Sequence, residues 1–195
     1  LLNIWYDLFG RIYVELLFAI PVLMLQVLIF KEIYQREAKD WVKAFQYGFT
    51  VALGMSMKMT FFPFIFLPLF LIKATREKFR YVFYTLVSFC LLALPVVFQF
   101  RKFIRWMADL FMHSGVYRGG PKSVVNPVLF LKSIQLLITA HSNFFMVLLV
   151  LLLLAFFAGK GTNRVLKTLN WGVLVVMMIF VFFIGKHFEL RYFIP

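Results

Sequence analysis

The sequence predicts an all-α membrane protein: a multi-helix transmembrane bundle with a short helical hairpin and extracytoplasmic interfacial helices. Hydrophobic residues make up 63% of the 195 residues and charged residues only 15%, whereas a soluble domain is about half apolar and a quarter charged. Apolar stretches recur at close to the roughly 20 residues that a helix needs to cross a bilayer. This composition excludes a soluble enzyme and a nucleic-acid-binding module, despite the net charge of +13.

The predicted membrane helices follow the apolar stretches of the chain, at 12–30, 41–57, 61–72, 81–99, 144–159 and 169–185. The second and third form a hairpin, because the apolar stretch 41–72 is too long for one span and carries Lys58 and two prolines. At the α-helical rise, the arm 61–72 is only about 18 Å long. We therefore expect that arm to cross the bilayer only in part.

A different pattern lies between residues 100 and 143. Apolar and charged residues recur with a period of 3.6 over 101–113, which predicts a helix lying in the membrane interface. A loop rich in Gly and Pro follows at 114–127, and 128–139 is again amphipathic. The chain is thus interpreted as one transmembrane region, 1–195, with an extracytoplasmic loop at 100–143.

Three short basic loops predict the orientation. Segments 31–43, 73–80 and 160–167 carry about half of the 21 Lys and Arg residues. The positive-inside rule gives most weight to short loops and places these in the cytoplasm. The basic residues of 100–143 then lie on the opposite side, where an anionic partner is expected. Cys90, the single cysteine, lies in an apolar run and is expected to be a small buried hydrophobic residue.

Three motifs together resemble the GT-C superfamily of polytopic membrane glycosyltransferases, which includes protein mannosyltransferases and aminoarabinose transferases. The Gly-containing helix from Gly48 to Lys58 is similar to a family helix that ends in a Thr-Lys or Ser-Lys pair. The segment His113-Ser-Gly-Val-Tyr-Arg-Gly-Gly resembles an extracytoplasmic loop of bacterial members. The third motif, Arg191-Tyr192-Phe-Ile-Pro, is similar to one that opens a late family helix.

This resemblance implies an enzyme that moves a sugar from a polyprenyl-phosphate donor to a lipid, glycan or protein acceptor outside the cytoplasm. It implies an integral protein of the bacterial inner membrane that contacts membrane lipids and no nucleic acid. The catalytic acid of such enzymes follows the first helix, so it is expected upstream of Leu1, and the chain is interpreted as an interior fragment. No cofactor is expected within it, and the acidic ligands of the divalent metal that some members use would also lie upstream.

Eight residues are predicted to contact the donor. Interfacial Arg and Lys side chains suit a phosphate at headgroup depth, a flexible loop suits the sugar, and ionisable residues inside a membrane are costly and usually functional. Asp7 is included because family members often carry an acid before this span. No metal site is predicted, because His113, His141 and His187 lack ligand spacing. The predicted contacts are Asp7, Lys58, His113, Tyr117, Arg118, Lys122, Arg191 and Tyr192.

The alternatives come from other functional classes. A secondary transporter would explain a broken helix with Lys58 at a midplane site, although the sequence shows no inverted repeat. An O-antigen ligase or polymerase would also have a basic extracytoplasmic loop, and a purely structural membrane subunit would have loops without a pocket. The sequence alone does not determine the sugar, the acceptor or the oligomeric state.

Overall fold

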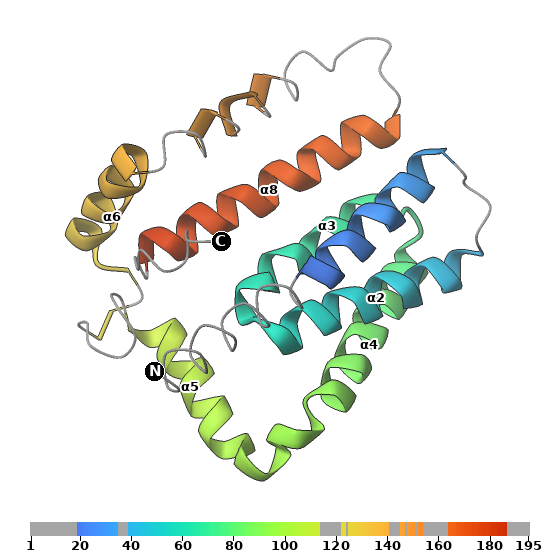
Figure 1. Ribbon diagram of the computed structural model, residues 1–195, viewed down its shortest axis with the longest axis horizontal. Helices are drawn as coiled ribbons and strands as arrows, with labels where there is room; N and C mark the ends of the chain where they lie inside the picture. The colour runs from blue at the N-terminus through green and yellow to red at the C-terminus, as the bar shows by residue number, and fades with distance from the viewer. Residues whose placement is uncertain are drawn as a thin grey trace, which may run out of the picture. The chain divides into compact units, whose positions relative to one another are not determined.

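The computed structural model describes residues 19–34, 39–113, 122–123, 125–140, 145–146, 148–150, 152–153 and 164–186. All regular structure in these residues is helical (Figure 1). They fall into two compact units. Unit 1 comprises Leu1–Leu94 and Asn163–Leu169, and unit 2 comprises Pro95–Thr162 and Asn170–Pro195.

The elements follow one another along the chain as α-helices with two short 3₁₀ segments. Residues 19–34 are helical. The later elements are α2 (Asp40–Met57), η1 (Met59–Ile65), α3 (Phe66–Leu71), α4 (Thr75–Leu92), η2 (Leu94–Gln99), α5 (Phe100–Met112), α6 (Pro127–Ala140) and α8 (Arg164–Lys186).

The predicted hairpin at 41–72 is confirmed. α2 ends at Met57, and Lys58 is extended, with φ −152° and ψ 116°. A Cβ placed on Gly54 would meet the ring of Phe61. In a continuous helix, residues seven apart lie about 10 Å from each other along the axis. The contact therefore requires the chain to reverse direction at Lys58.

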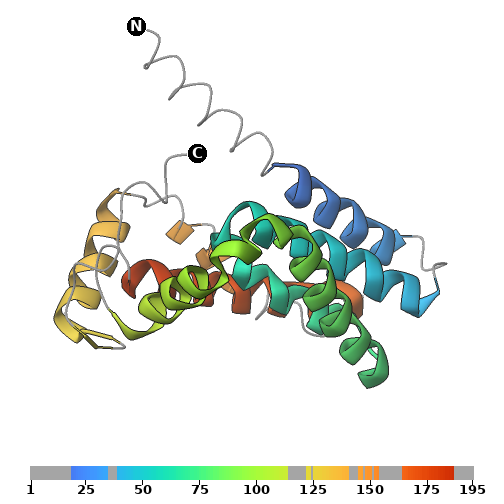
Figure 2. The same cartoon turned by 90° about the horizontal axis from the view of Figure 1, so that it is seen from below.

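The returning arm of the hairpin is short and mostly 3₁₀. Pro63 lies inside η1 and has no N–H to donate, which disfavours an α-helical start. A second reversal follows at residues 72–74, and the hydroxyl of Tyr81 in α4 donates to the Ile65 carbonyl at 2.8 Å. After two reversals α2 and α4 run in the same direction (Figures 1 and 2). Lys58 thus lies at one end of these helices, and the starts of α2 and α4 lie at the other.

Small residues on α2 allow it to pack closely on α4. Ala44, Gly48 and Ala52 are buried and spaced four residues apart, on one face of the helix. A Cβ at Gly48 would lie 3.0 Å from the amide nitrogen of Thr85. Any side chain at position 48 would therefore be tightly crowded by the backbone of α4.

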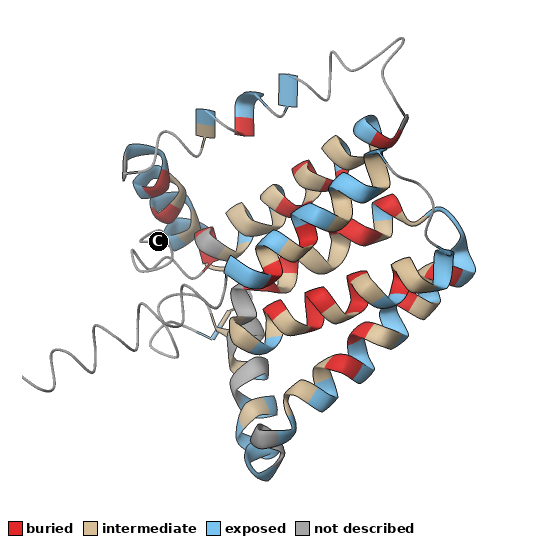
Figure 3. Cartoon of the chain, turned by 45° about the vertical axis from the view of Figure 1, so that its right-hand side comes forward, coloured by how far each residue is buried: buried red, intermediate tan, exposed pale blue. Residues whose placement is uncertain are grey.

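The two faces of α4 are inverted relative to a soluble amphipathic helix. Its buried residues are polar or carry a polar tip, and they recur at helical spacing: Glu77, Tyr81, Thr85 and Ser88. Its exposed residues are mostly apolar, including Phe79, Val82, Phe83, Leu86, Val87 and Leu91. Phe83 is 62% exposed, whereas Thr85 is 2% exposed. Figure 3 shows these burial classes on the ribbon.

Three details of the sequence-based prediction are wrong. α4 begins at Thr75 and ends at Leu92, where residues 81–99 were predicted as one helix. The helix starts early because its first turn, Thr-Arg-Glu-Lys, consists largely of helix-forming residues. It ends early because Pro95 disfavours the α-helical conformation at Leu94, and the 3₁₀ segment η2 follows. α8 likewise begins at Arg164, five residues before the predicted start. Cys90 is exposed, because it shares the apolar outer face of α4.

In unit 2, Asn126 starts α6 as an N-cap. Its Oδ1 accepts hydrogen bonds from the amides of Val128 and Leu129 at 3.1 and 3.2 Å, and Pro127 occupies the first helical position. The ring of Phe130 then contacts Gly185 of α8. The predicted helices 101–113 and 128–139 are both present, as α5 and α6.

One helix of the described residues, Val165–Phe183 within α8, is both long and apolar enough to cross a bilayer. Two shorter apolar helices, Phe61–Leu71 and Pro127–Thr139, lie below that length. Leu174 of α8 and Leu148 form a small buried cluster, against which Phe145, Met177 and Val181 pack. Two predicted spans lie partly outside the described residues: positions 12–18 of the span predicted at 12–30, and much of the span predicted at 144–159.

Candidate functional site

Lys58 lies where α2 ends and η1 begins. Its amide donates to the Gly54 carbonyl at 2.9 Å and its carbonyl accepts from the Phe61 amide at 2.9 Å, so its backbone is held on both sides. The side chain is half-buried. Lys58 therefore lies at the point where the apolar hairpin turns, as the sequence predicts.

His113 follows the last turn of α5. Its amide donates to the Asp109 carbonyl at 3.0 Å, and its ring Nδ1 lies 3.3 Å from the same oxygen. A protonated Nδ1 would donate this bond, which leaves Nε2 as the nitrogen available to a substrate. The ring is half-buried, and Lys122, further along the chain, is exposed.

The predicted contact residues are divided between the two units. Lys58 belongs to unit 1, and His113 and Lys122 belong to unit 2. It stays a prediction that one cavity is lined by Lys58, His113, Arg118 and Arg191. Five predicted contacts lie outside the described residues: Asp7, Tyr117, Arg118, Arg191 and Tyr192.

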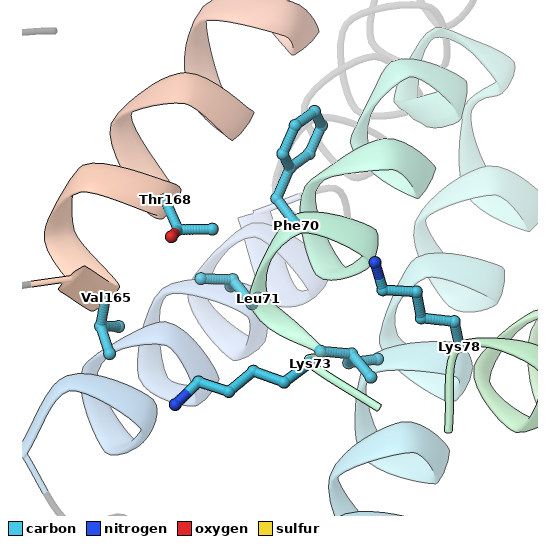
Figure 4. A pocket seen from close by; sticks show the side chains of 7 residues that line it. Phe70, Leu71, Lys73, Lys78, Val165 and Thr168 are labelled. Carbon is cyan, nitrogen blue, oxygen red and sulfur yellow. The ribbon is translucent and has the colours of Figure 1, made fainter. Parts of the chain in front are cut away.

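Unit 1 contains a basic pocket of about 200 Å³ at the end opposite Lys58. Its walls come from the last turn of α3 and the segment that follows it, from α4, and from the first turns of α8. Figure 4 shows Lys73 extending toward Val165 of α8, while Lys78 extends toward the last turn of α3. The lining residues are Phe70, Leu71, Ile72, Lys73, Lys78, Val165 and Thr168.

The charged side chains of unit 1 are unevenly paired. Glu77 accepts from Arg80 at 2.6 Å, and the ammonium of Lys43 lies 2.8 Å from Glu32. Within the described ranges, neither Lys73 nor Lys78 has a carboxylate partner. The charged residues among the described part of the pocket lining are both lysines, which gives this lining a positive charge.

The sequence alone does not reveal this pocket. Segments 73–80 and 160–167 were predicted as separate basic loops on one side of the membrane. The pocket brings Lys73 and Lys78 next to Val165 and Thr168, at the boundary of those two loops. The sequence feature that points toward such a pocket is the presence of two basic segments, each directly beside the end of an apolar helix.

No three His, Cys, Asp or Glu side chains lie close enough to hold a metal ion in the part of the chain that the structure describes. Lys186 ends α8 and is 3% exposed. Its position in the last turn suits a cation, because the C-terminal end of a helix carries partial negative charge.

Comparison with known protein families, with curated proteins and with solved structures finds no match to this chain.

Proposed function

We propose that this chain is part of an integral membrane glycosyltransferase of the GT-C type. The enzyme would transfer a sugar from a polyprenyl-phosphate donor to a lipid, glycan or protein acceptor on the extracytoplasmic side of a bacterial inner membrane. The residues of this chain would bind the donor, and none of them is assigned the catalytic role.

The inverted faces of α4 support membrane insertion. Water would favour the opposite arrangement, because apolar side chains gain about 25 cal/mol for each Å² they bury. In a bilayer the lipid solvates Phe83 and Leu86, and helices associate through small residues and polar contacts. The pairing of Gly48 with the polar face of α4 has this character. The hydroxyls of Thr50 and Thr85 donate to carbonyls of their own helices at 2.8 Å, so neither needs water.

Helix length also supports several membrane-embedded elements. α2 and α4 have 18 residues each, or about 27 Å, against a hydrocarbon core of about 30 Å. α8 is longer, with 23 residues. Among the described helices, α8 alone carries a strongly apolar window. α4 does not, since it begins with four charges in six residues. Those charges would lie at headgroup depth, where they contact water and phosphate.

The observation that carries the donor-binding proposal is the reversal at Lys58. It follows a helix with close-packed glycines, at the place where the resemblance expects a lysine. A half-buried ammonium beside an apolar hairpin suits a ligand with a charged phosphate and a long apolar tail. The exposed Arg101, Lys102 and Arg105 of α5, together with its exposed Phe100 and Ile104, give a second surface suited to the interface.

A donor titration of the complete gene product tests this proposal, with polyprenyl-phosphate-linked hexoses and pentoses as probes. Each charge-assisted contact to phosphate contributes about 1.5–3 kcal/mol, so Lys58→Gln and Arg191→Ala should each weaken donor use by about tenfold or more. Arg191→Lys should recover part of the loss, because a point charge replaces a bidentate fork.

Lys132→Ala is the matched control. Lys132 is exposed on α6, and its removal should change donor use by less than about twofold. Equal and small effects at positions 58, 191 and 132 would contradict donor binding by these residues.

A secondary transporter is the second candidate, and the interruption of the apolar segment at Lys58 is the observation that favours it. The two functions give different products. A transporter would accumulate a solute in sealed vesicles without forming a glycosidic bond. A glycosyltransferase would release polyprenyl phosphate and produce a glycosylated acceptor.

A further inference from the structure

The basic pocket of unit 1 lies at the opposite end of the helices from Lys58. α2 separates the two ends by about 27 Å, given its 18 residues. The pocket is therefore distinct from the hairpin turn at Lys58. It also does not depend on any sugar transfer, since its residues have no part in that proposal.

The charge of the pocket determines the charge of its ligand. Among the residues that the structure describes, Lys73 and Lys78 are the charged residues of its lining, and none of the lining residues is a carboxylate. Glu77, the acid in the first turn of α4, is 7% exposed and bonded to Arg80. The ligand is therefore an anion, and the ammonium groups of Lys73 and Lys78 offer several donors to its oxygens.

The volume and the apolar walls of the pocket restrict the size and the chemistry of its ligand. A volume of about 200 Å³ is below the roughly 300–1,000 Å³ of pockets that take whole cofactors or drug-sized molecules. Phe70, Leu71, Ile72 and Val165 form an apolar side, and Phe70 is itself partly exposed. A small anionic group attached to an apolar chain satisfies both sides of the pocket.

The location of the pocket agrees with this ligand. It lies at the end of unit 1 where α2, α4 and α8 begin, and the exposed Lys39 and Lys167 lie at the starts of α2 and α8. Short basic segments of this kind favour the cytoplasmic leaflet, which is rich in anionic lipid. We infer that this pocket binds a phosphate group carried on an apolar chain, as in the headgroup of an anionic phospholipid.

Ligand titration of the complete gene product in a neutral detergent tests the inference. The probes are dioctanoyl phosphatidylglycerol, dioctanoyl phosphatidylcholine and inorganic phosphate. The expected result is preferential binding of phosphatidylglycerol and a loss of about tenfold or more in affinity in Lys73→Gln/Lys78→Gln, equivalent to at least one decade in Kd. Lys73→Arg/Lys78→Arg should keep most of the affinity, because both charges remain.

The matched control is Lys39→Gln/Lys167→Gln, which removes the same charge from the same end outside the pocket. It should change the affinity by less than about twofold, since neither residue lines the pocket and surface charges outside it are screened. Equal losses in both double variants would overturn the inference and leave only general surface attraction. Binding of inorganic phosphate with the affinity of phosphatidylglycerol would overturn the lipid part and assign the pocket to free phosphate.

Discussion

Gly48 of α2 lies directly against Thr85 of α4, and a Cβ on Gly48 would be 3.0 Å from the Thr85 amide nitrogen. That neighbour is backbone, which cannot move aside as a flexible side chain can. The close approach buries the polar face of α4 against α2. The crossing is thus the structural basis of the inverted arrangement in unit 1.

Gly48→Leu should destabilise the α2–α4 pair. Overpacking of a filled interface costs about 1–3 kcal/mol, and the fixed backbone of Thr85 favours the upper part of that range. The measurement is SDS-induced unfolding in mixed micelles. Val82→Leu is the control, since Val82 is on the exposed face of α4, and it should change stability by less than about 0.5 kcal/mol. Equal effects would show that the helices do not meet at Gly48.

The hairpin reversal is testable through Gly54 and Phe61. Gly54→Ala should destabilise the protein, because the new methyl group would meet the fully buried Phe61 ring. Phe61→Leu alone should also destabilise it by leaving a cavity. In the double variant the smaller side chain makes room for the methyl group. We expect a favourable coupling of about 0.5–3 kcal/mol in the double-mutant cycle.

Strict additivity of the Gly54 and Phe61 variants would mean that the two residues do not touch. The apolar segment would then continue through Lys58 without reversing. That outcome would also remove the geometric basis for the donor-binding proposal.

Tyr81→Phe should weaken the attachment of α4 to the hairpin. The variant removes the hydroxyl that donates to the Ile65 carbonyl, and a typical hydrogen bond contributes about 0.5–1.5 kcal/mol net. Tyr84→Phe is the control, because the Tyr84 hydroxyl makes no hydrogen bond to the residues that the structure describes. Unfolding measurements that show the same small change in both variants would contradict the role of the Tyr81 hydroxyl.

The sequence predicted the helical class and the break at Lys58, because both follow from local chemistry. A charge and nearby prolines inside an apolar run identify a break without any knowledge of the partners. The start of α4 was missed for the same reason: Arg76, Glu77, Lys78 and Arg80 were interpreted as loop because they are charged. They are also good helix formers, and their periodicity continues into the buried stripe of Tyr81 and Thr85.

The basic pocket depends on tertiary structure and could not be found from the sequence. Lys73 and Val165 are separated by more than ninety residues, and no local pattern shows that they meet. The outward position of Cys90 was missed because an apolar neighbourhood was taken to mean a protein core. In a bilayer, an apolar run faces lipid as readily as protein.

Cys90 provides the most direct test of the central claim, that unit 1 lies in a bilayer with the apolar face of α4 toward lipid. It is the only cysteine in the chain and is exposed on α4, so a spin label attaches there without further substitution. The measurement is the collision rate of that label, in reconstituted vesicles, with oxygen and with a water-soluble nickel complex. Contact with lipid predicts frequent collisions with oxygen, which concentrates in the hydrocarbon, and few with the nickel complex. Frequent collisions with the nickel complex would place this face of α4 in water and contradict the account.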